Sequence, residues 1–283
     1  MVNQILEGDC LDLMKKMPDK HVQCCITSPP YYSVRDYGIE GQIGAEETPE
    51  EYIEKMVEIF REVRRILKDN GTVWLNIGDT YKNKKLLMIP HKLAIALQKD
   101  GWLVRQDIIW NKTACMPEPV KDRCVQSHEH IFLLSKKTKY YFDWEAIQEP
   151  VANPNRKNYQ NGSRSNGING DRNDNDLFKR SKNFSFDLRR KRSVWSVATK
   201  AYPEAHFAVF PPELIEPCVL AGCPFGGTVI DPFGGSGTTA VVAMMNGRKS
   251  IICELNEKYI SIAQKRILEV KKEYGIDSEA EWL

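Results

Sequence analysis

Short apolar runs of strand length alternate along the chain with longer stretches whose apolar residues recur every three or four positions. The clearest helical pattern follows Thr48-Pro49-Glu50-Glu51, which is typical of a helix start with Thr48 as N-cap, Pro49 in the first turn and Glu51 reaching back. We expect Asn70-Gly71 to end this helix. The apolar positions of its buried face are Ile53, Met56, Val57, Phe60, Val63 and Leu67.

The rest of the chain repeats this alternation. Apolar runs bounded by turn residues predict buried strands over 22–28, 72–78, 104–110, 130–135, 227–233 and 249–255. Helical spacing predicts helices over 89–101, 211–222, 236–247 and 256–275, and Pro217 either kinks the second of these or marks its start. Strands and helices in alternation imply an α/β fold, with a mostly parallel sheet and helices on both faces.

One segment breaks the pattern. Residues 151–195 are rich in Asn, Gly, Arg and Asp, and they hold 11 Lys/Arg against 4 Asp/Glu in a chain whose net charge is only +2. Such a composition cannot build a core of its own. We therefore divide the chain into a main domain of 1–148 and 196–283 and a basic insertion of 149–195. A basic segment on a mildly acidic body suggests that the segment contacts a polyanion.

Size and composition exclude several classes of protein. A chain of 283 residues can bury a stable core without disulfides or metal. No stretch is long and apolar enough to cross a bilayer, and the N-terminus lacks the pattern of a secretory signal, so we expect a cytoplasmic protein. The 8 cysteines form no Cys-x-x-Cys pair, so we expect reduced thiols in the core and no bound metal.

A glycine-rich run from Asp231 to Thr239 connects a predicted strand to a predicted helix. In this setting glycines let a ligand approach backbone N–H groups at a helix N-terminus, although a purely structural turn is the alternative. The run contains neither Gly-Lys-Ser/Thr nor Gly-x-Gly-x-x-Gly, which disfavours a phosphate-binding loop and a dinucleotide. Glu254 ends the next strand, where an acidic side chain can accept hydrogen bonds from both hydroxyls of a ribose.

A second run, Ser28-Pro29-Pro30-Tyr31, also follows a predicted strand. Its residue types suit methylation of an amino group on a base, whose nitrogen lone pair is delocalised into the ring. Two acceptors aimed at the N–H bonds, Ser28 Oγ and the Pro29 carbonyl, would localise that lone pair. Tyr31 offers a face on which an extruded base can stack. A proline-rich turn with a buried tyrosine is the alternative.

Together these runs resemble the S-adenosylmethionine-dependent DNA methyltransferases that act on an exocyclic base nitrogen. Their order, catalytic run first, resembles the circularly permuted beta group of that family, and residues 28–44 resemble its longer signature. The resemblance implies a Rossmann-like methyltransferase fold, base flipping and S-adenosylmethionine as cofactor.

The resemblance also assigns roles to individual residues. It implies that the glycine loop holds the methionine end of the cofactor, that Glu254 holds the ribose and that Asp9, in Gly8-Asp9-Cys10, approaches the adenine. The expected catalytic residues are Ser28, Pro29, Pro30 and Tyr31. The expected cofactor-binding residues are Asp9, Cys10, Asp231, Phe233, Gly235, Gly237, Thr238 and Glu254.

The target base and the DNA contact follow from the same family. Serine in the first catalytic position favours N4 of cytosine, and the insertion 149–195 is expected to recognise double-stranded DNA, with Arg189, Arg190 and Arg192 as contacts. We expect a role in restriction–modification beside a cognate endonuclease. The alternatives are methylation of adenine N6, methylation of RNA or of a protein amide, and a DNA-binding module without activity.

Three further features of the chain bear on other chemistries. Methylation of cytosine C5 needs a cysteine thiolate, but Cys218 lies in an apolar helical stretch away from both runs. His128-Glu129-His130 places two histidines on one face of a strand without a third ligand in sequence, so a structural or DNA-facing role is favoured over a metal. Trp110-Asn111-Lys112 ends a strand and is expected to line the edge that faces DNA.

Overall fold

The computed structural model describes residues 3–36, 38, 41–115, 117–151, 188–199, 210–275 and 280–282. They form two compact units, one of Met1–Asp143 with Arg192–Leu283 and one of Trp144–Lys191. The smaller unit overlaps the predicted insertion of 149–195 but has other bounds, so the division of the chain at 149 and 195 stays a prediction. Its described part contains the short strands β8 (Glu149–Pro150) and β9 (Leu188–Arg189), which pair antiparallel.

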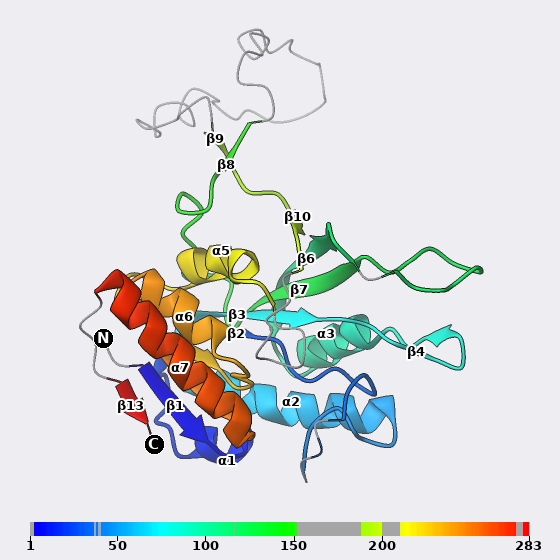
Figure 1. Ribbon diagram of the computed structural model, residues 1–283, viewed down its shortest axis with the longest axis horizontal. Helices are drawn as coiled ribbons and strands as arrows, with labels where there is room; N and C mark the ends of the chain where they lie inside the picture. Colours follow the sequence, from blue (N-terminus) through cyan, green and yellow to red (C-terminus); the bar gives the residue numbers. More distant parts are fainter. Residues whose placement is uncertain are drawn as a thin grey trace, which may run out of the picture. The chain divides into compact units, whose positions relative to one another are not determined.

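A nine-stranded sheet organises the larger unit (Figure 1). Among the described strands of this sheet only β7 runs antiparallel to its neighbours, so the predicted mostly parallel α/β sheet is confirmed. From one edge to the other the order is β10 (Val194–Val197), β6 (Leu103–Lys112), β7 (His128–Ser135), β3 (Leu67–Ile77), β2 (Val22–Thr27), β11 (Thr228–Asp231), β12 (Lys249–Glu254), β1 (Asn3–Glu7) and β13 (Ala280–Trp282).

Helices cover both faces of this sheet, as predicted. On one face lie α1 (Cys10–Lys15), α2 (Pro49–Ile66) and α3 (Ile89–Lys99), and on the other α5 (Pro212–Gly222), α6 (Thr238–Met245) and α7 (Glu257–Tyr274) (Figure 1). Successive side chains of a strand point to opposite faces. In β12, accordingly, Ile251 and Cys253 pack in the core under the first group of helices, and Ile252 packs under α6 and α7.

The N-terminal end of α2 is confirmed and its C-terminal end is not. Thr48 caps the helix by accepting a hydrogen bond from the Glu51 N–H at 3.2 Å. The expectation that Asn70-Gly71 ends the helix is wrong, because α2 ends at Ile66 and these residues lie inside β3. There the register with β2 shifts, and a Cβ on Gly71 would lie 2.6 Å from the Gln23 carbonyl oxygen. Gly71, which the sequence suggested as a helix stop, is instead required by a β-bulge in β3.

Two other expectations need adjustment. Pro217 lies inside α5, which begins at Pro212. Cys115 and Cys124 are exposed, so the expectation of core thiols holds only for the buried cysteines, which are Cys10, Cys24, Cys25, Cys218, Cys223 and Cys253. All eight are free thiols. Within the part of the chain that the structure describes, no helix has both the length and the apolar character needed to span a membrane.

The sheet reverses its direction of winding between β2 and β11. From β2 the chain crosses through α2 to β3 on one side, and from β11 it crosses through α6 to β12 on the other. The two strands pair directly, Val229 with Cys24 and Ile230 with Cys25. Ligands of open α/β sheets bind beyond the carboxyl ends of the strands at such a reversal. Both runs singled out in the sequence start at this point.

Candidate active site

A cavity of about 290 Å³ lies at the carboxyl edge where β2 and β11 end. Its lining joins the two predicted runs, since it includes Ser28, Tyr31, Phe233 and Gly235. Of the predicted catalytic and cofactor-binding residues, only Gly237 does not line it. The fold therefore brings together segments that lie at opposite ends of the chain.

The catalytic run leaves β2 in a fixed conformation. The Tyr52 hydroxyl of α2 donates to the Pro30 carbonyl at 2.9 Å, which anchors the second proline. Ser28 Oγ lies 3.2 Å from the Tyr31 hydroxyl oxygen. Serine and tyrosine side chains of the run thus contact each other at the wall of the cavity.

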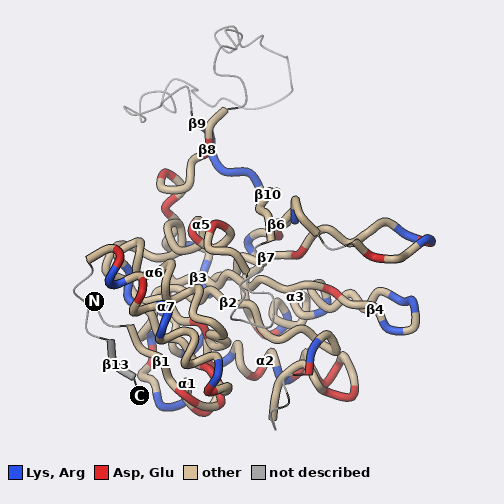
Figure 2. The backbone as a smooth tube through the Cα atoms, viewed as in Figure 1, with Lys and Arg blue, Asp and Glu red and all other residues tan. Residues whose placement is uncertain are grey.

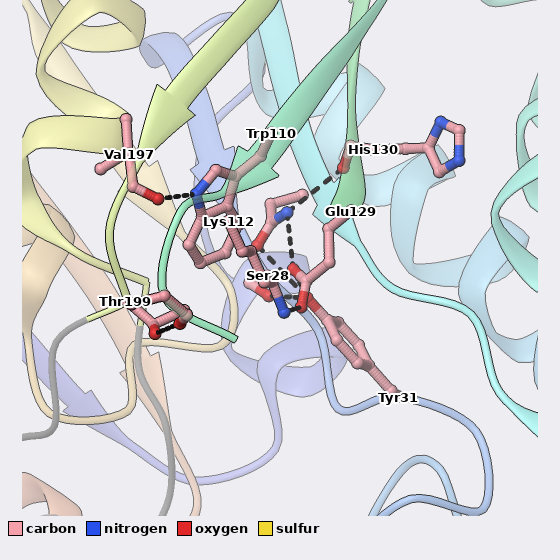
Figure 3. Close-up of polar contacts among 10 residues, drawn as sticks. Ser28, Tyr31, Trp110, Lys112, Glu129, His130, Val197 and Thr199 are labelled. Carbon is pink, nitrogen blue, oxygen red and sulfur yellow. Dashed lines mark hydrogen bonds and ion pairs between the residues drawn. The ribbon is translucent and has the colours of Figure 1, made fainter. Parts of the chain in front are cut away.

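Tyr31 is held by a carboxylate that reaches it from β7 (Figure 3). Its hydroxyl lies 2.7 Å from Glu129 Oε2 and 3.2 Å from Asn76 Oδ1. The hydroxyl has one hydrogen, and the shorter contact to a charged acceptor takes it. Ser28 then donates to the Tyr31 oxygen, which makes a chain from Ser28 through Tyr31 to Glu129. Burial, followed by the negative charge of Glu129, raises the pKa of Tyr31 well above its ordinary value.

Three residues around Tyr31 complete this network. Asn76 Nδ2 donates to Glu129 Oε2 at 3.1 Å, and Lys112 forms an ion pair with the other carboxylate oxygen of Glu129. Gly78 lets the tyrosine ring approach, since a Cβ there would lie 2.7 Å from its Cε2 atom. The orientation of Tyr31 is therefore set by charge and packing from β3, β6 and β7.

The sequence did not identify Asn76 or Glu129 as part of the site. Asn76 is the last polar residue of an apolar strand. Glu129 lies between two histidines, and this pattern raised the question of a metal site rather than of a contact with Tyr31. Lys112 was expected only to line the edge that faces DNA. The position of these residues at the ends of predicted strands could have identified them. β3 and β6 end at the same edge of the sheet as β2, and the antiparallel β7 begins at that edge. Polar residues at these three strand ends must meet.

The glycine loop serves both packing and access to the cavity. Gly235 and Gly237 have φ of +51° and +78°, a region that other residues adopt at a cost. A Cβ on Gly237 would lie 2.8 Å from that of Ala263 on α7, so this glycine permits close packing. A Cβ on Gly235 would meet no atom closer than 3.9 Å. The Cα side of Gly235 is open for a ligand to approach, while its N–H donates to Glu254 Oε2.

Asp231 joins the two runs from a buried position. Its carboxylate accepts hydrogen bonds from the hydroxyls of Thr27 and Thr239, each at 2.6 Å, and from the Phe233 N–H at 3.0 Å. Burial raises the pKa of Asp231 to about 7, although these hydrogen bonds oppose the shift. The geometry makes Asp231 a structural link, and its predicted contact with the cofactor stays a prediction.

Glu254 and Asp9 line the cavity at or beyond the ends of the adjacent strands β12 and β1, and Glu254 contacts the glycine loop directly. Glu254 accepts from the Gly235 N–H at 2.7 Å and from the Asn256 N–H at 2.8 Å, and burial raises its pKa. Each carboxylate oxygen has a second lone pair, so these bonds leave acceptor capacity for hydroxyl groups. Asp9 caps α1, because its Oδ1 accepts from the Leu11 N–H at 2.9 Å.

Thr238 begins α6, and an arginine of α7 contacts its side chain. Arg266 Nη1 lies 3.0 Å from Thr238 Oγ1 and 2.8 Å from both the carbonyl and the hydroxyl oxygen of Ser236. This arginine was not singled out in the sequence. Arg266 thus donates hydrogen bonds to two residues of the loop, Ser236 and Thr238, that also line the cavity.

The three arginines predicted to contact DNA fall in different parts of the chain. Arg189 and Arg190 belong to the smaller unit, where Arg189 Nε lies 3.0 Å from Glu149 Oε1 and Arg190 stacks 4.6 Å from the Trp144 ring. Arg192 belongs to the larger unit and is exposed. Figure 2 shows lysine and arginine along the described chain that leads out of β9. Most of the basic insertion lies outside the described residues, so its contact with DNA stays a prediction.

Comparisons with known proteins agree on a single class. The family model described as DNA methylase, for N6 and N4 methyltransferases, matches residues 22–265. The type II methyltransferase M.SmaI of Serratia marcescens is 42% identical over 94% of this chain and 90% of its own length, and M.Cfr9I of Citrobacter freundii is 40% identical over 93% and 87%.

Solved structures share the fold. The PvuII cytosine-N4-specific DNA methyltransferase superposes with a TM-score of 0.71 at 19% identity, covering 98% of this chain and 94% of its own. M1.HpyAVI in complex with S-adenosylmethionine has a TM-score of 0.59 at 19% identity, covering 94% and 99%.

Proposed function

We propose that this chain, which belongs to the DNA methylase family of N6 and N4 methyltransferases, methylates N4 of cytosine in double-stranded DNA. It is a DNA methyltransferase that uses S-adenosylmethionine. The base, the site residues and the DNA contacts are the proposed part.

The position of Ser28 supports methylation of an amino group on a base, and its identity as serine supports the choice of cytosine. Its hydroxyl lies at the cavity wall and lies 3.2 Å from the Tyr31 oxygen, which in turn contacts Glu129. Because Ser28 donates its hydrogen along this chain, its oxygen keeps lone pairs for the N–H bonds of an amino group. Serine in this position accompanies cytosine N4 in the family that the chain resembles.

The other residues of the run act by orientation. The Pro29 carbonyl is the second proposed acceptor, and its proline has no N–H that would compete beside it. The ring of Tyr31, held through its hydroxyl, is the proposed stacking surface for a base turned out of the duplex. Alignment of the amino nitrogen with the methyl group should supply much of the rate.

The residues around the cavity fit S-adenosylmethionine, which when bound supplies an electrophilic methyl group on sulfur. Gly235 presents open backbone, where the methionine end would lie. Glu254 has acceptor capacity for the ribose hydroxyls, and Asp9 and Cys10 also line the cavity and are the proposed contacts for the adenine. Phe233 adds an apolar side chain to the cavity lining.

Recognition of DNA is assigned to the basic insertion 149–195. Arg189, Arg190 and Arg192 are the proposed contacts to phosphates or guanine edges. The type II names of M.SmaI and M.Cfr9I support a role in restriction–modification, in which methylation protects DNA from a cognate endonuclease. Such an endonuclease would be a partner in function and need not bind this chain.

Adenine N6 is the second candidate. The matching family model covers both N6 and N4 enzymes, and both target atoms are amino groups conjugated to a ring. The same acceptors would serve either base, so chemistry at the reacting nitrogen does not separate them. The size of the base and the hydrogen-bonding groups along its edge would distinguish cytosine from adenine.

Nucleoside mass spectrometry tests the proposal directly. Plasmid DNA is taken from a methylation-deficient host that expresses the intact chain, the Ser28→Ala variant or the Ser261→Ala variant. Ser261 hydrogen-bonds within α7 and serves as the matched control. We expect N4-methylcytosine with the intact chain and with Ser261→Ala but not with Ser28→Ala. N6-methyladenine instead would overturn the assignment of the base while keeping the family.

A further inference from the structure

Behind the Tyr31 network, three side chains of metal-ligand type converge from three elements. They are His91 of α3, Asp107 of β6 and His130 of β7, and their candidate ligand atoms all lie within 4.8 Å of one another. His130 follows Glu129 directly in β7, so its ring points to the other face of the sheet, away from Tyr31 (Figure 3). The cluster is therefore separate from the cavity described above.

This cluster could not be recognised from the spacing of residues in the sequence. His128-Glu129-His130 offers two histidines on one face of a strand, and no third ligand follows at a spacing typical of metal sites. The tertiary structure supplies the missing ligands, Asp107 from the neighbouring strand and His91 from the first turn of α3. Our expectation of no metal rested on local spacing alone.

The contacts within the cluster are those of a preformed ligand set. His130 Nδ1 lies 2.9 Å from Asp107 Oδ1, and the rings of His91 and His130 meet edge to face with centroids 4.7 Å apart. His91 Nδ1 is buried and has no hydrogen-bond partner among the described residues. A buried polar atom without a partner is costly, and a bound cation beside it would remove that cost.

Chemistry and access both favour a transition-metal ion. Imidazole nitrogen and carboxylate oxygen are ordinary ligands of Zn²⁺, with bonds of about 2.0–2.2 Å, and three protein ligands plus water is a common arrangement. His130 is buried, whereas the Asp107 side chain is 40% exposed, so an ion can enter from solvent. The ring of His128 lies 5.4 Å from that of His130 and adds a third imidazole beside the cluster.

We propose that His91, Asp107 and His130 form a binding site for a divalent transition-metal ion, with Zn²⁺ as the best match. The ion would join α3, β6 and β7. It would also restrain the His130 backbone, whose carbonyl accepts from Asn76 at 3.2 Å, the same amide that contacts Glu129. This site is independent of which base the enzyme methylates.

The test uses the untagged full-length chain carrying Cys115→Ser and Cys124→Ser, because these exposed thiols would themselves bind Zn²⁺. After removal of metal by a chelator, Zn²⁺ is titrated by calorimetry and Co²⁺ by visible absorption. We expect one ion per chain and Co²⁺ bands of a four-coordinate site. His91→Gln and Asp107→Asn should each weaken binding at least tenfold, and Zn²⁺ should raise the Tm of the parent only.

Two controls keep the result interpretable. His21→Gln removes an exposed histidine outside the cluster and should leave affinity unchanged. Circular dichroism without metal establishes that each variant is folded, since the Tm shift is compared only among folded proteins. Absence of stoichiometric binding, or binding that His91→Gln leaves intact, would overturn the proposal. The cluster would then be a hydrogen-bonded pair of His130 and Asp107 with His91 beside it and no bound metal.

Discussion

The Thr27 hydroxyl donates a 2.6 Å hydrogen bond to the carboxylate of Asp231, which lies 204 residues further along the chain. Thr27 is the last residue of β2 before Ser28, and Asp231 is the last residue of β11 before the glycine loop. One buried contact therefore helps to set the position of the proposed catalytic run relative to the glycine-rich run. Its strength depends on the charge state of Asp231.

Replacing Asp231 with Asn should change how stability depends on pH. The pKa of Asp231 is raised to about 7 in the folded chain, while in the unfolded chain it is ordinary, about 3.9. Between these values the folded state holds a proton that the unfolded state has released. The contribution of this group to the free energy of unfolding therefore falls as pH rises, by at most about 1.4 kcal/mol per pH unit.

Asn cannot ionise and lacks this dependence. We subtract the unfolding free energy of the parent from that of Asp231→Asn, both measured by urea denaturation. This difference should increase from pH 5 to pH 7.5, because the parent loses stability over this range and the variant does not. Asp12→Asn, which removes an exposed carboxylate of α1, is the control. A difference that stays constant over this range would show that Asp231 is ionised throughout.

Tyr31→Phe should slow methyl transfer while leaving cofactor binding unchanged. The ring that stacks is kept, but Ser28 loses the acceptor of its hydrogen and Glu129 loses a donor. We expect the single-turnover rate of Tyr31→Phe to be about tenfold lower than that of the parent. The rate of Tyr31→Ala should be lower still, because it also loses base stacking, which is worth roughly 1–3 kcal/mol per base. Tyr274→Phe, at an exposed position of α7, should behave like the parent. A weaker Kd for S-adenosylmethionine in Tyr31→Phe would contradict the assigned role.

Gly237→Ala and Gly235→Ala should fail in different ways. Both place a side chain at positive φ, which costs roughly 1–2 kcal/mol. Gly237→Ala adds the approach of 2.8 Å to Ala263, so the variant should be destabilised by roughly 2–4 kcal/mol in urea denaturation. Gly235→Ala should be more stable than Gly237→Ala, but calorimetry should show that it binds S-adenosylmethionine more weakly than the parent does. Equal destabilisation, or equal affinities, would refute the distinction.

Neutralising the arginines of the insertion should weaken DNA binding and its dependence on salt. In Arg189→Gln/Arg190→Gln/Arg192→Gln, the slope of log affinity against log salt should fall by about 0.9 for each phosphate that the protein no longer neutralises.

The matched control for the arginine variant replaces three lysines by glutamine. These are Lys15, Lys16 and Lys99, which lie at the C-terminal ends of α1 and α3, on the opposite edge of the sheet from the cavity. The control should keep the salt dependence of the parent. An unchanged slope in the arginine variant would remove these arginines from the DNA contact.

Local pattern predicted the elements that have strong local signals. The cap at Thr48 was predicted and is present, and the predicted helix over 256–275 is observed as α7 (Glu257–Tyr274) with Asn256 as its N-cap. β10 was not predicted, because Val194–Val197 follows a basic polar stretch. It is a strand because it pairs with β6 and buries Trp195 beside Trp74, with ring centroids 6.3 Å apart. Such pairing over a long separation outweighs local preference.

The sequence by itself determined the alternation of strands and helices, the two runs and hence the family, because each depends on residues adjacent in the chain. Only the tertiary structure decided which distant residues meet. It placed Glu129 against Tyr31, Asp231 against Thr27, and His91 with Asp107 and His130. These contacts depend on strand order and on which face of a strand each side chain takes, and neither is encoded in any local window. A one-residue shift in register would separate every one of them.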